Sequence, residues 1–219
     1  MKTAIILGGT GLVGSRLIDL LLGDSRYGKV TVLVRRPLNK AHKKLNEEII
    51  NFEKPEEWKN LIRGDEFYSC LGTTIKTAGS KEAQYKVDYS YQYAAAEIAA
   101  ANGIKKYVLI SSAGANLNSK MFYSRMKGKL DSDVKLLPFE SITIIKPSVL
   151  VGKREQKRKG EEFAAKALQF LIKFIPLLNK YKPIDAEIVA FAMINSANNP
   201  KSGAHEIELH EVFQAALIE

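Results

Sequence analysis

Hydrophobic positions along the chain fall into two patterns, short apolar runs and longer stretches with helical spacing. Continuous apolar runs are typical of strands that helices cover on both faces, because such strands have no side open to water. We predict seven short strands from this pattern, at residues 3–7, 30–34, 49–52, 67–70, 107–111, 142–146 and 205–209.

Helical patterns separate these runs. Residues 12–22 carry a broad apolar face that ends at Gly23, and an alanine-rich helix is predicted over 82–101, before the cap Asn102-Gly103. This alternation predicts an α/β fold, a doubly wound parallel sheet of about seven strands with helices on both faces. The chain has no internal repeat and no linker long enough to separate two domains, so we expect one domain over residues 1–219.

Residues 151–182 differ in character, and we expect them to form a small appendage to the sheet. Five basic residues come first, and residues 163–178 then have the pattern of an apolar helix with a narrow polar stripe. So wide an apolar face must be covered by something. It can pack into the core or form a lid over an apolar substrate pocket, make the subunit contact of a homodimer, or make a peripheral contact with an anionic membrane. We favour the lid.

Composition narrows the class of protein further. The net charge of +9 attracts polyanions in general, but no recognition module or aromatic array indicates specific nucleic-acid binding. Cysteines and histidines are too few for a structural metal site, and the single cysteine, Cys70, excludes an internal disulfide. No run of about 18 uncharged apolar residues is present. We therefore expect a soluble, cytoplasmic protein without a bound metal.

The most informative motif is the glycine-rich turn GGTGLVG at residues 8–14, between the first strand and the first helix. Gly8 lets the chain turn sharply, Gly11 leaves room for a pyrophosphate to reach backbone N–H groups, and Gly14 lets the helix pack close to the sheet. The anion would lie at the positive end of the helix. The motif therefore predicts a dinucleotide site with contacts from Gly8, Thr10, Gly11, Leu12, Val13 and Gly14.

The residues after the second strand indicate which dinucleotide is bound. NAD-specific sites carry an acidic residue there, which accepts a hydrogen bond from the ribose 2′-hydroxyl. This chain has Arg35 and Arg36 instead, with no Asp or Glu beside them. A guanidinium favours a 2′-phosphate through bidentate contacts, so we predict NADP(H) as the cofactor. The alternative is that both arginines are ordinary solvent-exposed residues of a loop and bind no ligand.

Four motifs together resemble the short-chain dehydrogenase/reductase superfamily. They are GGTGLVG at 8–14, RRP at 35–37, CLGTT at 70–74 and the serine pair at 111–112. The glycine spacing resembles the extended and atypical branches of that superfamily. More narrowly, most of the chain is similar to the Tat-interacting-protein oxidoreductase group and to NAD(P)H-binding proteins described as epimerase-like. The resemblance implies a Rossmann fold with strand order 3-2-1-4-5-6-7 and a small C-terminal substrate or lid appendage.

The resemblance also implies a catalytic set of serine, tyrosine and lysine. Tyr123 and Lys127 match the family's YxxxK pattern on the predicted helix after the fifth strand. Ser112 precedes them and would hydrogen-bond the substrate oxygen, with Ser111 as the alternative serine. Tyr123 would donate the proton, and Lys127 would supply positive charge and hold the ribose. By the same resemblance, the cofactor would also contact Cys70, Leu71, Gly72, Thr73, Ser111, Lys127 and Pro147.

Two residues depart from the family pattern. Lys146 precedes Pro147 where the family usually has an arginine, and Asp88 stands where extended members often carry an asparagine. The second departure puts an asparagine-centred proton relay in doubt.

These features favour an NADPH-dependent oxidoreductase that transfers hydride to a small, apolar carbonyl substrate through a Ser-Tyr-Lys set. An NAD(P)H-binding redox sensor or scaffold with little or no catalysis is the alternative, because a fold alone does not fix a function. A nucleotide-sugar epimerase is the least favoured, since the appendage is small and Arg35 disfavours a tightly held NAD.

Overall fold

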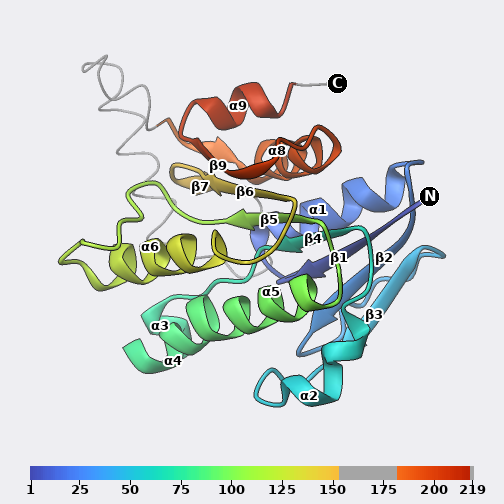
Figure 1. The fold of residues 1–219 in the computed structure, drawn as a ribbon, viewed down its shortest axis with the longest axis horizontal. Coiled ribbons are helices and arrows are strands. Elements are labelled where there is room, and N and C mark those ends of the chain that lie inside the picture. The colour runs from blue at the N-terminus through green and yellow to red at the C-terminus, as the bar shows by residue number, and fades with distance from the viewer. Residues whose placement is uncertain (153–181, 218–219) are drawn as a thin grey trace.

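The computed structural model describes residues 1–152 and 182–217 of the chain. Within them, seven parallel strands form one sheet in the order β3-β2-β1-β4-β5-β6-β9 (Figure 1). Their bounds are β1 Lys2–Leu7, β2 Tyr27–Val34, β3 Leu45–Ile49, β4 Glu66–Ser69, β5 Lys106–Ile110, β6 Ser141–Lys146 and β9 Gly203–Glu208. Counted along the chain, this is the order 3-2-1-4-5-6-7, so the predicted Rossmann fold is confirmed.

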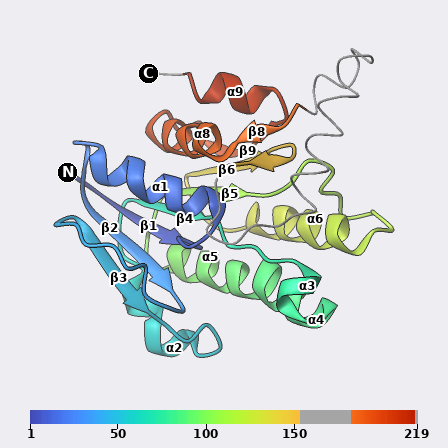
Figure 2. The ribbon, with the colours of Figure 1, turned by 180° about the vertical axis from the view of Figure 1, so that it is seen from behind.

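Helices cover both faces of the sheet (Figures 1 and 2). On one face, α1, α8 and α9 enclose a core with the sheet residues Ile6, Val32 and Val108. On the other, α2, α5 and α6 enclose a second core with Ile5 and Leu7. The bounds of these helices are α1 Leu12–Gly23, α8 Ala186–Asn198, α9 Glu211–Ala215, α2 Pro55–Trp58, α5 Tyr91–Ala101 and α6 Phe122–Val134.

The third predicted strand is wrong in position. The structure places β3 at Leu45–Ile49, whereas the apolar run at 49–52 follows the strand and supplies Ile50 and Phe52 to the core. An edge strand pairs on one side only, and β3 is half-buried along most of its length, so it needs no continuous apolar run. The polar sequence LNEEI therefore forms the strand.

The predicted helix over 82–101 is interrupted. It consists of α4 (Lys81–Tyr85), a π-helical turn at Lys86–Ser90, and α5, while a 3-10 turn (Lys59–Leu61) follows α2 and α3 (Ile75–Ala78) precedes α4. A π-helical turn inserts an extra residue into a helix and is frequent at functional sites. Nothing in the alanine-rich pattern indicated it.

The segment interpreted as a lid lies almost wholly outside the described residues, which omit 153–181. The chain on either side of it pairs, because β7 (Leu150–Val151) and β8 (Ile184–Asp185) form a two-stranded parallel sheet. Among the described residues, no helix is long and apolar enough to cross a membrane.

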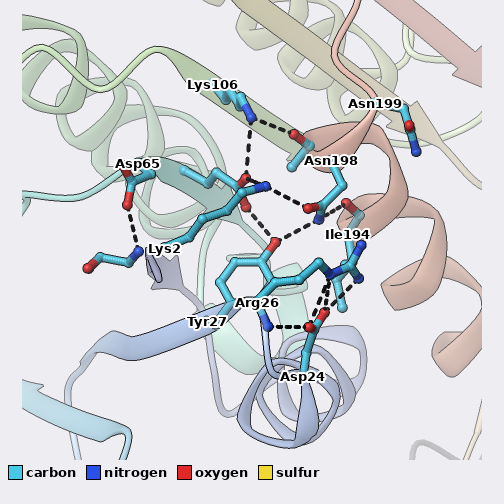
Figure 3. A network of polar contacts seen from close by, with 12 residues as sticks. Lys2, Asp24, Arg26, Tyr27, Asp65, Lys106, Ile194, Asn198 and Asn199 are labelled. Carbon is cyan, nitrogen blue, oxygen red and sulfur yellow. Dashed lines mark hydrogen bonds and ion pairs between the residues drawn. The ribbon is translucent and has the colours of Figure 1, made fainter.

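A buried carboxylate ties together the amino-terminal ends of four strands (Figure 3). Glu66, fully buried at the start of β4, accepts hydrogen bonds from Lys2 Nζ at 2.9 Å, Tyr27 Oη at 2.6 Å and Tyr68 Oη at 2.7 Å. Lys106 Nζ lies 3.5 Å from the same carboxylate. The charge is therefore both paired and hydrogen-bonded, which a buried carboxylate requires.

The same cluster reaches across to α8. Lys2 Nζ donates to Asn198 Oδ1 at 2.6 Å, and Asn198 Nδ2 donates to Tyr27 Oη at 2.8 Å. Figure 3 shows these side chains meeting between the sheet and the end of α8. The cluster thus fixes α8 to the amino-terminal edge of the sheet. The candidate functional site lies at the opposite edge.

Replacing Glu66 should lower the free energy of unfolding and make that free energy less dependent on pH. Burial alone would raise the pKa of the Glu66 carboxyl, but hydrogen bonds from Tyr27, Tyr68 and Lys2 outweigh it and hold the pKa below its usual value. The stabilisation is therefore complete above the unfolded pKa, about 4.3, and is lost as pH falls through the folded pKa. Glu66→Gln should cost roughly 2 kcal/mol or more at pH 7 in denaturant unfolding.

Glu140→Gln is the matched control, since Glu140 pairs with Lys105 at the surface and both side chains are 66% exposed. It should cost less than about 1 kcal/mol. If Glu66→Gln and the wild type lost stability equally on acidification, the role assigned to Glu66 would be wrong.

Candidate functional site

The glycine-rich turn lies at the carboxyl end of β1, against the loop that follows β4. Gly8 has φ +87°, a conformation that favours glycine. A Cβ placed on it would lie 2.5 Å from both the Cys70 carbonyl carbon and the Leu71 nitrogen. Backbone atoms cannot give way as a flexible side chain can, so both the turn and its contact with the β4 loop require glycine here.

Two further glycines bring α1 against this turn. A Cβ on Gly14 would lie 2.3 Å from the Gly8 oxygen, so the first turn of the helix packs directly on the glycine turn. A Cβ on Gly9 would lie 2.5 Å from Val32 Cγ1 and 2.7 Å from Ile18 Cδ1. Sequence analysis gave Gly9 no role, although it lies within the motif, and the structure shows that it lets α1 approach β2.

The start of α1 can receive an anion. Its N-cap is Gly11, which has no side chain to cap the helix, and the Gly11 N–H donates to the Gly8 oxygen at 3.0 Å. Thr10 is exposed, Leu12 is partly buried and Val13 is buried. The first N–H groups of a helix have no partner within the helix and attract negative charge. This arrangement fits the pyrophosphate of a dinucleotide.

A cleft of about 580 Å³ lies beside the turn, at the carboxyl ends of β2 and β3. Arg35 lines it, and of the two predicted arginines only Arg35 is among the described lining residues. A cleft at this edge of a doubly wound sheet is where such folds bind nucleotides. Sequence analysis missed several other lining residues, namely Asn51, Phe52, Glu53, Lys86 and Tyr91.

The loop after β4 presents its backbone to the glycine turn. The Cys70 thiol is directed away from that loop, since Sγ lies 3.8 Å from Met193 Sδ on α8, and burial raises the pKa of the thiol. Thr73 N–H donates to Asp88 Oδ2 at 2.8 Å, and Thr73 lines the cleft. Asp88, the departure from the family asparagine, thus anchors the loop. Leu71 is partly buried and Gly72 exposed within it.

The two candidate serines have different surroundings. Ser111 is 5% exposed, and its Oγ donates to Asp131 Oδ2 at 2.9 Å. Ser112 is partly buried, and its Oγ donates to the neighbouring carbonyl of Ala113 at 3.3 Å. Because the hydroxyl of Ser111 is occupied by a buried carboxylate, Ser112 is the more accessible of the two.

Lys127 lies beneath the same strand end. It is 3% exposed, and its Nζ donates to the Ile110 carbonyl at 3.4 Å. The loops after β5 and β6 join nearby, where Ala113 N–H donates to the Pro147 carbonyl at 3.0 Å. The structure therefore gathers Lys127, the serine pair and Pro147 at one edge of the sheet.

Tyr123 is less tightly held than Lys127. It lies one turn earlier on α6 and is 41% exposed. Within the described part of the chain, no hydrogen bond joins it to Ser112 or Lys127. Tyr123 is thus the exposed member of the predicted set, one helical turn from Lys127.

A buried charge cluster supports this region. Lys146 Nζ lies 2.5 Å from Glu206 Oε2, 3.3 Å from Glu208 Oε1 and 3.5 Å from Asp131 Oδ2. Burial raises the pKa of Asp131, while the Ser111 hydrogen bond and the charges of Lys127 and Lys146 oppose that shift. Lys146 therefore links α6 to β9. Among the described residues, no group of three or more His, Cys, Asp or Glu side chains could hold a metal ion.

Comparison with known proteins decides the family. The model of the NAD(P)H-binding family matches residues 8–164, well over half of the chain. The chain belongs to the NAD(P)H-binding family. The matched range contains the glycine turn, the lining residues of the cleft and α6.

Curated relatives extend over nearly the whole chain. It is 33% identical over 210 residues to HTATIP2 of Rattus norvegicus, covering 94% of this chain and 85% of that protein. It is 32% identical over 216 residues to FMP52 of Eremothecium gossypii, covering 95% of each. The predicted resemblance to the Tat-interacting-protein oxidoreductase group is therefore confirmed.

The prediction of a cytoplasmic protein is wrong. FMP52 relatives from Eremothecium gossypii, Debaryomyces hansenii and Candida albicans are all named mitochondrial, which conflicts with it. That prediction depended on the single cysteine, which excludes a disulfide within the chain but does not specify a compartment.

Solved structures agree on the fold. The enzyme WbmH of Bordetella bronchiseptica, in complex with NAD+, has a TM-score of 0.71 at 15% identity, covering 95% of this chain and 75% of that one. UDP-glucose 4-epimerase of Thermotoga maritima, with UDP-glucose, has a TM-score of 0.70 at 13% identity, covering 97% and 80%. At such low identity these similarities establish the fold alone.

Two glycines of α1 allow a matched test of the turn. Gly14→Ala should lower the free energy of unfolding by roughly 1–3 kcal/mol and weaken dinucleotide binding, because the new methyl group meets the Gly8 carbonyl. Gly23→Ala, at the last residue of the helix, meets nothing within 4 Å. It should leave binding unchanged and raise stability by up to about 1 kcal/mol. Equal effects in thermal unfolding and dinucleotide titration would contradict the assigned packing.

Proposed function

We propose that this protein is an NADPH-dependent oxidoreductase that reduces a small, apolar carbonyl compound. The observation that carries the proposal is the position of Arg35 in the cleft beside the glycine turn, because a guanidinium there favours a 2′-phosphate over a 2′-hydroxyl. The family supports dinucleotide binding, and the choice of NADPH is our inference from this side chain.

The cofactor would lie along the carboxyl edge of the sheet. Its adenosine end would occupy the cleft at Arg35, and its pyrophosphate would lie on the first turn of α1. Its nicotinamide end would then reach the region of Lys127, Ser112 and Pro147. The fit is supported by glycines that leave the start of α1 uncapped and by a cationic cleft next to it.

The reaction adds a hydride and a proton to a carbonyl group and gives an alcohol. A nicotinamide cofactor, when bound, would supply the hydride to the carbonyl carbon. Ser112 would donate a hydrogen bond to the carbonyl oxygen, and Tyr123 would transfer its phenolic proton to that oxygen as negative charge develops there. Lys127 would hold the ribose hydroxyls and stabilise the tyrosinate that remains.

One observation favours the alternative, a redox sensor or scaffold with little catalysis. Tyr123 is 41% exposed, and within the described residues no hydrogen bond joins it to Ser112 or Lys127. A general acid must come within hydrogen-bond reach of its substrate, although such contacts often tighten only when ligands bind.

Cofactor preference tests the first half of the proposal. Calorimetric titration should show tighter binding of NADPH than of NADH, and Arg35→Ala should weaken NADPH binding about tenfold or more, because it removes a charge-assisted contact. Arg36→Ala is the adjacent control, since Arg36 is exposed and only Arg35 is among the described residues that line the cleft. Equal binding of both dinucleotides by the wild type would rule out an NADP-specific site.

Catalysis requires a separate test. NADPH oxidation should be followed by absorbance with a panel of apolar aldehydes and ketones. Tyr123→Phe should lower kcat by about 100-fold or more and leave NADPH binding intact, since it removes only the proton donor. Tyr93→Phe, on α5, is the control for loss of a phenol hydroxyl. Turnover that survives both Tyr123→Phe and Lys127→Met would refute the assigned mechanism and favour the sensor.

A further inference from the structure

The cleft beside the glycine turn contains more charge than Arg35 alone. Lys86 and Glu53 also line it, so two cations and one carboxylate face the same space. The side chains of Lys86 and Glu53 are 58% and 54% exposed, which leaves both open to a ligand. Neither has a role in the site as derived so far.

Glu53 is held as an anion by two donors. Lys86 Nζ lies 2.9 Å from Glu53 Oε1, and Tyr91 Oη donates to the same oxygen. The hydrogen bond from Tyr91, and then that from Lys86, keep the pKa of the Glu53 carboxyl below its usual value. Glu53 therefore carries its charge at neutral pH, and Lys86 is the cation that balances it.

The backbone of Lys86 is anchored, whereas its side chain is more than half exposed. Lys86 is the first residue of the π-helical turn, and Asp88 of the same turn accepts the N–H of Thr73 at 2.8 Å. The turn is thus fastened to the loop after β4, which itself packs on Gly8. An exposed four-carbon stem on this fixed base can exchange one anionic partner for another.

We propose that Lys86 is a second cation for the 2′-phosphate of the dinucleotide and that Glu53 is its counterion while that phosphate is absent. The inference rests on the proposed use of NADPH and adds two residues that determine cofactor choice. A phosphate monoester carries about −1.5 to −2 charge at pH 7, more than Arg35 alone neutralises. Lys86 supplies the remaining positive charge, by contact with the phosphate or by cancelling the repulsion from Glu53.

The two dinucleotides then affect the Lys86–Glu53 ion pair differently. NADH has no charge at the 2′ position, so the Lys86–Glu53 pair stays as it is. NADPH places a second anion beside Glu53, and Lys86 is drawn toward it. Removing Lys86 should therefore weaken NADPH binding selectively, and removing the charge of Glu53 should strengthen it.

The test titrates purified full-length variants with NADPH, NADH and adenosine 2′,5′-bisphosphate. Lys86→Met should weaken binding of NADPH and of the bisphosphate about tenfold and change NADH binding less than about twofold, as expected for one charge-assisted contact. Glu53→Gln should strengthen NADPH binding severalfold and leave NADH binding unchanged. Lys201→Met removes an exposed lysine before β9, at the far edge of the sheet, and should change neither.

The outcomes separate this inference from the proposed function. If the wild type prefers NADPH and Arg35→Ala abolishes that preference, but Lys86→Met affects both dinucleotides alike or neither, the role of Lys86 is wrong and the NADPH site stands. A Glu53→Gln variant that loses NADPH affinity would also overturn the inference, since the carboxylate would then be a ligand. If the wild type binds no dinucleotide or prefers NADH, the proposed function is wrong, and the inference that rests on it is wrong as well. Thermal unfolding checks that each variant is folded.

Discussion

The contact between the glycine turn and the loop after β4 is the constraint on which the rest of the site depends. Gly8 can lie against the backbone of Cys70 and Leu71 only because it has no side chain and adopts a positive φ. Gly14 then brings the first turn of α1 onto the same backbone. The uncapped helix end, the loop after β4 and the Arg35 cleft are neighbours because of this approach.

The two edges of the sheet carry charge in different ways. At the amino edge, Glu66 has three hydrogen-bond donors and a second nearby cation, Lys106, so its burial is fully compensated. At the carboxyl edge, Asp131 Oδ2 contacts Ser111 and Lys146, while Oδ1 has no hydrogen-bond partner among the described residues. An unpaired buried oxygen costs about 1–3 kcal/mol. The cluster around Glu66 stabilises the fold. The cluster around Asp131 is less stable by that amount, and it lies where the candidate catalytic residues gather.

Much of the fold and the phosphate turn could be predicted, because glycine spacing and apolar runs are local signals. Six of the seven strands and the start of α1 followed from them, whereas the strand order was implied by the family resemblance. The edge strand β3 did not, since a half-buried strand carries no such run. Glu53 and Lys86 were missed for a related reason. They meet only because the chain after β3 and the π-helical turn converge on one cleft. No local pattern in either segment predicts this contact.

The choice between serines shows the same limit at a smaller scale. The sequence favoured Ser112 and left Ser111, its neighbour, open as the alternative. In the structure, adjacent residues at the end of β5 point their hydroxyls to different partners, and Ser111 is bound to Asp131 within the buried charge cluster. A hydroxyl that donates to a buried carboxylate cannot donate the same proton elsewhere at the same time, whereas the Ser112 hydroxyl donates only to a neighbouring backbone carbonyl. The surroundings of two neighbouring serines thus differ because of Asp131, on the helix opposite.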